Sequence, residues 1–478
     1  MSGYLTVLAV TFLILCSLYF YIKANITWSL ITILVLGFGL RVYGSLESSL
    51  HEWDERFHAL VAKNLMDDPL KPVLISDGLL NLDYTNWSMC HVWLAKPPLA
   101  FWMMALSMKV LGVNEYGLRF PSLIFSILSI YLTFLIGKKL YNEKIGLVAA
   151  FLYAINGLLY EINIGLMSGD HVDTLFHLLF QLSVLLVIKY TKVPKTKYLV
   201  LIGVLSGLAF LCKWIMSLFI LLVCFSYLIF VLKKIRETIN GACIIGFFFV
   251  LTLSPWLLLI WTKFPVESKW MIGQIFTPIG SVIQAHDGAW YYYLESIRIN
   301  VNEFIYLPLI FLIFVSFKRL NKERFLLLVW IFIPLMLLSV SETKRAVYLM
   351  MAATPLFIVS AWSMHYLYAI RSRIKYKWAA YLIICLFFAA AIRYSIERIK
   401  PFKPRLEKPE YRITMESLIE ETKFPPDSIV LLNEPYFIES RFYYNMKGYR
   451  YIDDENILRI KKSGYKVFEF REHKYVEL

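Results

Sequence analysis

Long apolar segments recur along the whole chain and are separated by shorter polar connections. Each segment is long enough to cross the hydrocarbon core of a bilayer as a helix, which rises about 1.5 Å per residue. Spanning strands are excluded because they need alternating apolar and polar positions, which these segments lack. The pattern predicts an all-α polytopic membrane protein with about 12 spans, near residues 4–22, 26–43, 120–137, 145–160, 171–188, 198–212, 214–232, 242–261, 303–317, 325–340, 347–369 and 378–396.

The composition supports this fold class. Hydrophobic residues make up 59% of the chain, aromatic residues 17%, and the mean hydropathy is +0.60. The first apolar segment lacks the basic start and small-residue cleavage site of a signal peptide, so we expect it to be retained as a span. Most of the cysteines lie in predicted spans and only Cys90 lies in an outer loop, which excludes an intrachain disulfide framework.

The net charge of +14 is concentrated in short loops. Every second loop is basic, and an excess of Lys and Arg in short loops marks the cytoplasmic side of a membrane protein. These basic loops are 138–144, 189–197, 233–236, 318–324 and 371–377. The alternate connections therefore face outward, and they include the acid-rich loop 44–119 and the long loop 262–302. We expect membrane lipid, and no nucleic acid, among the partners.

The chain changes character near residue 397, where prolines and charges end the last apolar segment. Beyond this point "ITMESLIEET" has a helical pattern, while "SIVLLN", "YRYID" and "YKVFEF" have the pattern of short strands. We therefore predict a transmembrane domain at 1–396 and a small extracytoplasmic α/β domain at 397–478.

The first outer loop opens with "HEWDERFHALVAKNL", residues 51–65. On a helix His51, Glu55 and His58 share one face, with Asp54 beside them. A solvated helix at the membrane surface would explain these charges without any function. The segment nevertheless follows a span directly, and Glu55 and His58 have the spacing of ligands in helical metal sites. The spacing differs from the zinc motif His-Glu-x-x-His, because Glu55 stands where the second histidine would be.

Charged residues also stand at the outer ends of later spans. Lys96 precedes the helix start at Pro97-Pro98, where it could simply extend toward the membrane surface. Asp170 and Asp173 lie at the start of a span, and helix capping would account for one of them. An acid that enters an apolar segment is a candidate functional residue.

A third group lies in the late outer connections. His286 precedes the aromatic residues 290–293, which are typical of an interfacial belt. Lys344, Arg345 and Tyr348 lie between two spans, and positive charge on the outer side opposes the bias seen elsewhere in the chain. A lipid phosphate at the outer surface would account for these cations.

Taken together, the outer segments resemble the GT-C membrane glycosyltransferases, in particular the protein mannosyltransferase-like group (glycosyltransferase family 39) that includes the lipid A aminoarabinose transferase. The resemblance covers about residues 25–370. It is carried by the order of "WDERFHALVAKN", "KPPLAFWMMALSMKVLGVNEYGLRFPS", "SGDHVDTLFHLLF", "GLAFLCKW", "SPWLLLI", "HDGAWYYYL" and "SETKRAVYLMMAATP".

The resemblance implies transfer of a sugar from a polyprenyl-phosphate donor to an acceptor on the outer face of the membrane. It implies acidic site residues at Asp54, Glu55, Asp170 and Asp173, donor-phosphate contacts at Lys96, Arg56, Lys344, Arg345 and Tyr348, and a loop histidine at His286. His286, Glu55 and His58 are candidate ligands for an optional divalent metal ion. The family usually has Glu before Lys-Pro-Pro, whereas this chain has Ala95, so the metal stays in question. The usual Lys-Gly pair is replaced by Lys213-Trp214.

The chemistry of such a transfer suits these residues. Polyprenyl phosphate is a good leaving group, so the protein has to orient the acceptor, take its proton and neutralise the departing phosphate. We predict an inverting glycosyltransferase of a bacterial inner membrane whose active site faces outward, with a glycan, lipid or protein as acceptor. The alternatives are a transporter or flippase of a lipid-linked glycan, which would predict internal repeats and charges on both sides of the midplane, and a scaffold protein, which would leave the first-loop acids unused.

Overall fold

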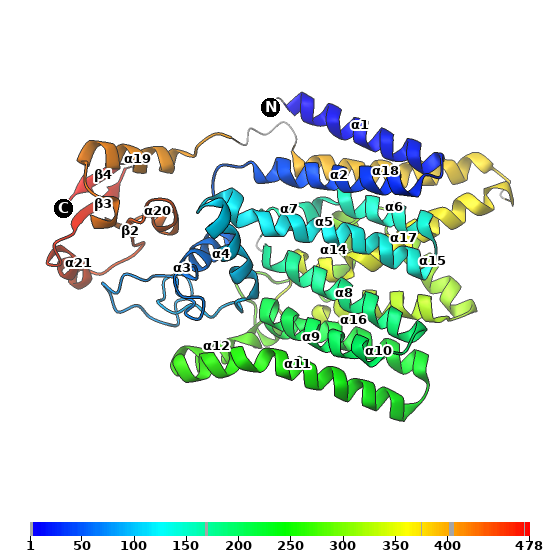
Figure 1. The fold of residues 1–478 in the computed structure, drawn as a ribbon. Coiled ribbons are helices and arrows are strands. Elements are labelled where there is room, and N and C mark those ends of the chain that lie inside the picture. Colours follow the sequence, from blue (N-terminus) through cyan, green and yellow to red (C-terminus); the bar gives the residue numbers. More distant parts are fainter. Residues whose placement is uncertain (1–2, 168–170, 374, 401–405, 473) are drawn as a thin grey trace.

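The computed structural model describes residues 3–167, 171–373, 375–400, 406–472 and 474–478. Figure 1 shows a bundle of helices that run back and forth, with short turns at one end and long loops at the other. The bundle helices are α1 (Gly3–Ile22), α2 (Ile26–Ser45), α5 (Glu115–Leu140), α6 (Glu143–Ile155), α7 (Gly157–Asn163), α8 (His171–Lys192), α9 (Thr196–Lys213), α10 (Leu218–Leu232), α11 (Ile235–Lys263), α15 (Tyr306–Lys318), α16 (Lys322–Val340), α17 (Met350–Ile370) and α18 (Lys377–Ile399).

Nine helical stretches in the described part of the chain are long and apolar enough to cross a membrane, or ten if the bent pair α6 and α7 forms one span. One of them, Thr196–Leu232, has 37 residues, which as a single helix would be about 55 Å long. It consists of α9 and α10, joined by the 3-10 turn η1 (Trp214–Ser217). Each predicted span overlaps one of the bundle helices, α15 being shorter than a full span, so the predicted polytopic helical fold is confirmed.

The bend between α6 and α7 is stabilised by a buried arginine. The two helices meet at 60°, and a break inside the bundle leaves backbone carbonyls without partners. Arg41 of α2 is fully buried and donates hydrogen bonds to the carbonyls of Ala154 (2.5 Å) and Tyr153 (3.4 Å). Asn156 caps α7 by accepting a bond from the Leu159 amide at 3.0 Å. A charge inside the second span therefore has a structural role.

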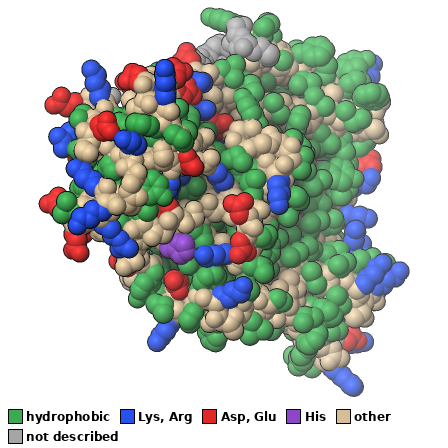
Figure 2. Space-filling model, turned by 60° about the vertical axis from the view of Figure 1, so that its left-hand side comes forward, with side chains coloured by type: hydrophobic (Ala, Val, Ile, Leu, Met, Phe, Trp, Pro, Cys, Tyr) green, Lys and Arg blue, Asp and Glu red, His purple; other side chains and the backbone are tan. Residues whose placement is uncertain are grey.

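The burial of the helices separates an inner from an outer layer. In their most apolar windows α8 and the stretch containing α17 are 89% buried, whereas α1 is 11% buried and α11 22%. In Figure 2 charged side chains gather at opposite ends of the molecule, and a wide hydrophobic surface lies between them. The peripheral helices thus present apolar side chains to lipid, as the hydropathy predicts.

Shorter helices shape the loops. They are α3 (Asp54–Asn64), α4 (Leu99–Leu111), α12 (Pro265–Ile275), α13 (Thr277–Gly280) and α14 (Tyr292–Asn300), with the 3-10 turns η2 (Ala346–Leu349) and η3 (Arg371–Arg373). The C-terminal segment contains α19 (Glu410–Thr422), η4 (Pro426–Ser428), β1 (Ile429–Leu432), α20 (Phe437–Tyr444), β2 (Lys447–Gly448), α21 (Asp454–Lys461), β3 (Lys466–Arg471) and β4 (Lys474–Glu477).

The four strands form one sheet in the order β2-β1-β3-β4. β1 pairs in parallel with β2 and β3, and β3 pairs antiparallel with β4. The predicted strands at "SIVLLN" and "YKVFEF" are present, but "YRYID" is not a strand. Pairing there ends once the Tyr449 amide has bonded to the Leu431 carbonyl at 2.8 Å, and Asp453 then caps α21.

The C-terminal segment is bound to the first outer loop, as the left-hand side of Figure 1 shows. Lys63 of α3 donates to the carbonyls of Arg441 (2.7 Å) and Phe442 (2.8 Å) near the end of α20, where a cation is favoured by the helix dipole. Arg441 in turn forms a buried ion pair with Asp77 at 2.7 Å. The first outer loop, including α3, is thereby bonded to the C-terminal segment at two points.

The alternation of basic loops fixes which end faces outward, and this can be tested with two exposed positions. In a background without the native cysteines, Glu421→Cys in α19 should react with a membrane-impermeant maleimide added to intact cells, while Lys195→Cys should react only after permeabilisation. The two positions are both exposed and so serve as matched controls. Labelling of Lys195→Cys alone in intact cells would invert the topology.

Candidate active site

Glu55 lies at the centre of a buried cluster of charges at the outer end of the bundle. Its carboxylate is 0% exposed and accepts bonds from Arg119 Nε (2.7 Å) and Nη2 (3.0 Å). His51 Nδ1 lies at 2.8 Å and His171 Nε2 at 3.0 Å. Burial alone would raise the pKa of Glu55, but Arg119 and the two histidines hold it well below its usual range. Glu55 is therefore a carboxylate with every oxygen engaged.

The turn before α8 packs closely on this cluster. Gly165 has a φ of +80°, and a Cβ atom placed there would lie 2.8 Å from Glu55 Oε1 and 2.9 Å from His171 Nε2. Only glycine combines that backbone conformation with so close an approach. The cluster thus joins the first outer loop to the start of α8, the helix that carries Asp173.

Asp54 has a different environment although it is the neighbour of Glu55. It is partly exposed at the start of α3 and, among the described residues, it makes no hydrogen bond or ion pair. Trp53, the residue before it, has φ 71° and ψ −130°, a conformation that bulky residues adopt only when the surrounding structure imposes it. The carboxylate of Asp54 interacts electrostatically with His286. Of the two adjacent acids, Asp54 is the one available to a substrate.

The loop that carries His286 is bonded to the connection between α16 and α17. The Lys344 amide donates to the His286 carbonyl at 2.8 Å, and the amides of Glu342 and Thr343 donate to the carbonyls of Ile279 and Pro278. Burial lowers the pKa of His286 and Arg345 lowers it further, whereas Asp54 opposes the shift. His286 is thereby kept neutral near pH 7, beside a carboxylate and a guanidinium.

The predicted cations Lys344 and Arg345 lie next to this histidine. Lys344 Nζ donates to the Ser341 carbonyl at 2.6 Å, and Arg345 Nη2 donates to Gln284 Oε1 at 2.5 Å. The Arg345 amide donates to the Tyr293 hydroxyl at 3.2 Å. Both side chains retain donors beyond these single bonds, so each can bind an anion as well.

A second set of contacts connects these cations to Asp173. Lys213, the last residue of α9, forms a buried ion pair with Asp173. The Lys213 ammonium also lies 4.8 Å from the centre of the Tyr348 ring. Asp173 and Tyr348 are far apart in the sequence, and Lys213 connects them in the structure. Lys213 was noted in the sequence only because Trp214 follows it where the family usually has glycine, and it was not predicted as a site residue.

Trp214 ties this lysine to the Lys-Pro-Pro segment. Its indole nitrogen donates to the Ala95 carbonyl at 3.2 Å, directly before Lys96. Trp214 has φ 41° and ψ −133°, a conformation suited to glycine, which is the residue the resemblance leads one to expect there. Lys96 is partly buried and has no hydrogen-bond or ion-pair partner among the described residues.

Three predicted site residues lie elsewhere or cannot be placed. The guanidinium of Arg56 lies 3.5 Å from Glu439 of α20, and burial raises the pKa of Glu439 to about 7 against the effect of Arg56. His58 is buried between the rings of Trp93 and Phe101, with centroids at 5.5 and 5.0 Å. Asp170 lies outside the described residues.

The candidate metal ligands do not fit a metal ion. No group of three or more His, Cys, Asp or Glu side chains among the described residues is arranged to hold one. Glu55 is bonded to Arg119, His58 is packed among aromatic rings, and His286 belongs to the exposed loop. No step of the chemistry is therefore assigned to a metal.

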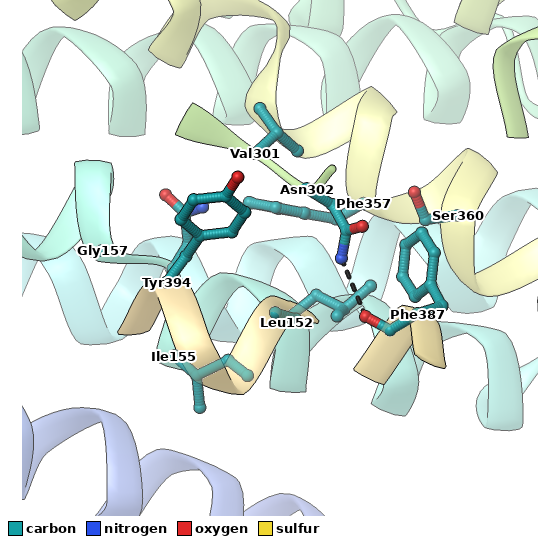
Figure 3. Close-up of a pocket in the computed structure, with 11 residues that line it drawn as sticks. Leu152, Ile155, Gly157, Val301, Asn302, Phe357, Ser360, Phe387 and Tyr394 are labelled. Carbon is teal, nitrogen blue, oxygen red and sulfur yellow. Dashed lines mark hydrogen bonds between the residues drawn. The ribbon is translucent and has the colours of Figure 1, made fainter. Parts of the chain in front are cut away.

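A small cavity inside the bundle is separate from these residues. Figure 3 shows it between α6, α17 and α18, with Asn302 donating a 2.9 Å bond to the Phe387 carbonyl across it. Its lining contains none of the predicted site residues, and it has room for about one water molecule. The predicted site residues that the structure describes instead lie at the outer end of the bundle.

The helical bundle with long loops at its outer end has the GT-C fold, as comparison with solved structures shows. The crystal structure of ArnT from Cupriavidus metallidurans bound to undecaprenyl phosphate superimposes with a TM-score of 0.65, at 10% identity and 92% coverage of both chains. The oligosaccharyltransferase AglB from Archaeoglobus fulgidus superimposes with a TM-score of 0.55, at 12% identity, covering 92% of this chain and 69% of that one.

Sequence comparison gives the same relationship. Residues 95–261 match the family described as dolichyl-phosphate-mannose-protein mannosyltransferase. The undecaprenyl phosphate-α-4-amino-4-deoxy-L-arabinose arabinosyl transferase of Pectobacterium atrosepticum is 24% identical over 290 residues, which are 58% of this chain and 51% of that protein. The chain spans little more than half the length of the curated relatives it matches. The predicted resemblance to the GT-C transferases is thus confirmed.

The partners of Glu55 predict that its main effect is on stability. Glu55→Gln removes the charge opposite buried Arg119, so the free energy of unfolding should fall by about 3–5 kcal/mol. Glu52→Gln, at an exposed position three residues away, should leave it unchanged. Thermal unfolding of both purified variants in one detergent measures the difference. A Glu55→Gln protein that is as stable as the wild type would show that the fold does not depend on this ion pair.

Proposed function

We propose that the chain is an integral-membrane glycosyltransferase that transfers a sugar from a polyprenyl-phosphate donor to an acceptor at the outer face of the membrane. The observation that carries the proposal is the contrast between two adjacent acids. Glu55 is paired with Arg119, whereas Asp54 interacts electrostatically with His286 and has no hydrogen-bond or ion-pair partner among the described residues. A free carboxylate beside a group of cations is what the reaction requires.

Each residue has a role in this scheme. Asp54 orients the acceptor hydroxyl and takes its proton as the new bond to the anomeric carbon forms. The bond from that carbon to the phosphate oxygen breaks, and the polyprenyl phosphate leaves with the electron pair. Attack and departure on opposite faces of the sugar invert the anomeric centre. Neutral His286 lies where it can accept a hydrogen bond from the acceptor or relay the proton onward.

The donor phosphate is assigned to Lys96, Lys344, Arg345 and Tyr348. Lys344 and Arg345 flank the His286 loop, and Lys96 is connected to Tyr348 through Trp214 and Lys213. Arg56 is left out of this set because its guanidinium faces Glu439. Asp173 pairs with Lys213, whose ammonium lies against the Tyr348 ring, so Asp173 has an indirect role in positioning Tyr348.

The comparisons favour this function over a transporter. The related proteins are named for arabinosyl transfer and for oligosaccharide transfer, and the ArnT structure carries undecaprenyl phosphate. The long loops that hold the proposed site residues lie at one end of the bundle (Figure 1), whereas a carrier would place its site near the midplane. An arabinose-type pentose donor and a bacterial inner membrane are the corresponding expectations for this chain.

Asp54→Asn preserves the shape of the side chain but cannot take a proton at neutral pH. Transfer from a polyprenyl-phosphate donor should fall by on the order of 10²–10⁴, the worth of a positioned general base, while donor binding is unchanged. The exposed residue Asp67 provides the control variant Asp67→Asn. Turnover in nanodiscs is measured for all three proteins, and wild-type turnover in Asp54→Asn would remove Asp54 from the mechanism.

The phosphate assignment predicts a loss of donor affinity. Lys96→Met, Lys344→Met and Arg345→Met should each weaken binding of polyprenyl phosphate by about 1.5–3 kcal/mol, because each removes a charge-assisted hydrogen bond. Lys269→Met, at an exposed position of α12, is the matched control. Binding is measured by titration of the purified protein in nanodiscs. Unchanged affinity in all three variants would place the phosphate elsewhere.

A further inference from the structure

A crevice lined by aromatic rings opens between the first outer loop and α12. Tyr84, Trp87, Trp270 and Glu267 form what is here named the aromatic crevice, and Ala95 belongs to its wall. None of the residues in the proposed mechanism supplies these rings. The crevice therefore needs an explanation of its own.

The rings of the crevice retain accessible faces. Tyr84 is 41% exposed and Trp87 37% exposed, although each belongs to a folded and well-bonded loop. The rings of Tyr84 and Trp270 lie 6.4 Å apart at 86°, so they form two perpendicular walls. Exposed aromatic residues that are fixed in this way offer a large contact area at little cost in conformational entropy.

Glu267 adds a polar group to these walls. Its side chain is partly buried in the first turn of α12, and among the described residues it makes no hydrogen bond or ion pair. The helix dipole favours an acid at this position, but it leaves both carboxylate oxygens without donors. A partly buried carboxylate between aromatic rings can therefore accept hydrogen bonds from a ligand.

The crevice adjoins both halves of the proposed active site. Ala95 in its wall directly precedes Lys96 and accepts the hydrogen bond of Trp214. The Trp87 ring packs against Phe57 at a centroid distance of 4.9 Å. Phe57 lies three residues after Asp54, which is about one turn of α3. The crevice wall at Trp87 is thus packed directly on α3, the helix that begins at Asp54.

We propose that the mouth of the aromatic crevice binds a saccharide unit of the acceptor, an inference that rests on the proposed function. The C–H faces of a sugar ring pack on aromatic rings, and its hydroxyl groups donate to a carboxylate such as Glu267. The interior has room for about one water molecule, so the sugar lies across the mouth. The charge of Glu267 would repel the carrier phosphate, which assigns the crevice to the acceptor rather than to the donor.

The test measures saccharide binding without any donor. The full chain in nanodiscs is titrated with a panel of methyl glycosides of glucose, galactose, N-acetylglucosamine and glucosamine, and binding is followed by saturation-transfer NMR. At least one glycoside should receive saturation at its ring C–H protons. Its affinity should fall by about tenfold in Glu267→Gln, which removes a hydrogen bond to a charged group, and by a similar factor in Trp270→Leu.

Trp261→Leu is the control, because Trp261 is 63% exposed on α11 and lies outside the crevice. Glu267→Gln keeps the shape of its side chain, so it tests the site even if Trp270→Leu fails to fold. No saturation of any glycoside by the wild type, or equal affinities in the wild type and Glu267→Gln, would overturn the inference.

Transfer from polyprenyl-phosphate donor, measured on the same samples, separates this inference from the proposed function. If transfer occurs but the KM for the acceptor is unchanged in Glu267→Gln and Trp270→Leu, the crevice does not bind acceptor and the transferase function stands. If glycosides bind in a variant-sensitive way but no transfer occurs, the saccharide site stands and the transferase function fails.

Discussion

The buried ion pair between Glu55 and Arg119 is the interaction on which the outer end of the bundle depends. Two charges removed from water are stable only when their geometry is good and their other hydrogen-bonding positions are filled. Here His51 and His171 fill them for Glu55, and backbone carbonyls of residues 45, 47 and 49 fill them for Arg119. The pair joins α3 to α5, and His171 adds α8, so the cluster fixes where Asp54 stands relative to the other outer loops.

This arrangement gives the two neighbouring acids different roles, a structural one for Glu55 and the proposed catalytic one for Asp54. Glu55 is held as a permanent anion and serves the fold, which leaves Asp54 free at the start of the same helix. Trp53 and Trp214 both have backbone conformations suited to glycine, and each lies next to a residue of the proposed site, Asp54 or Lys213. At Trp214, which is buried, the strain is offset by packing and by the hydrogen bond from its indole to Ala95.

The hydropathy pattern was sufficient to predict the spans, because length and apolar character are local properties of the chain. It was also sufficient to predict that the outer loops hold the charged residues of interest. It could not show that Arg119 forms its ion pair with Glu55 and not with Asp54, because residues 55 and 119 are far apart in the sequence and come together only in the folded chain. For the same reason Arg56 looked like a phosphate ligand, whereas its nearest anion is Glu439 of the C-terminal segment. A two-residue strand such as β2 (Lys447–Gly448) is too short to show an alternating pattern. The prediction of a strand at "YRYID", which directly follows β2, was therefore wrong.

The proposed reaction breaks the bond between a sugar and a polyprenyl phosphate at the outer face of the membrane. The most direct measurement supplies the polyprenyl-phosphate sugar only to the outer leaflet of proteoliposomes, with acceptor outside, and follows both products. If the chain is such a transferase, polyprenyl phosphate is released together with a glycosylated acceptor of inverted anomeric configuration. Movement of the intact lipid-linked sugar to the inner leaflet, without release of polyprenyl phosphate, would contradict it.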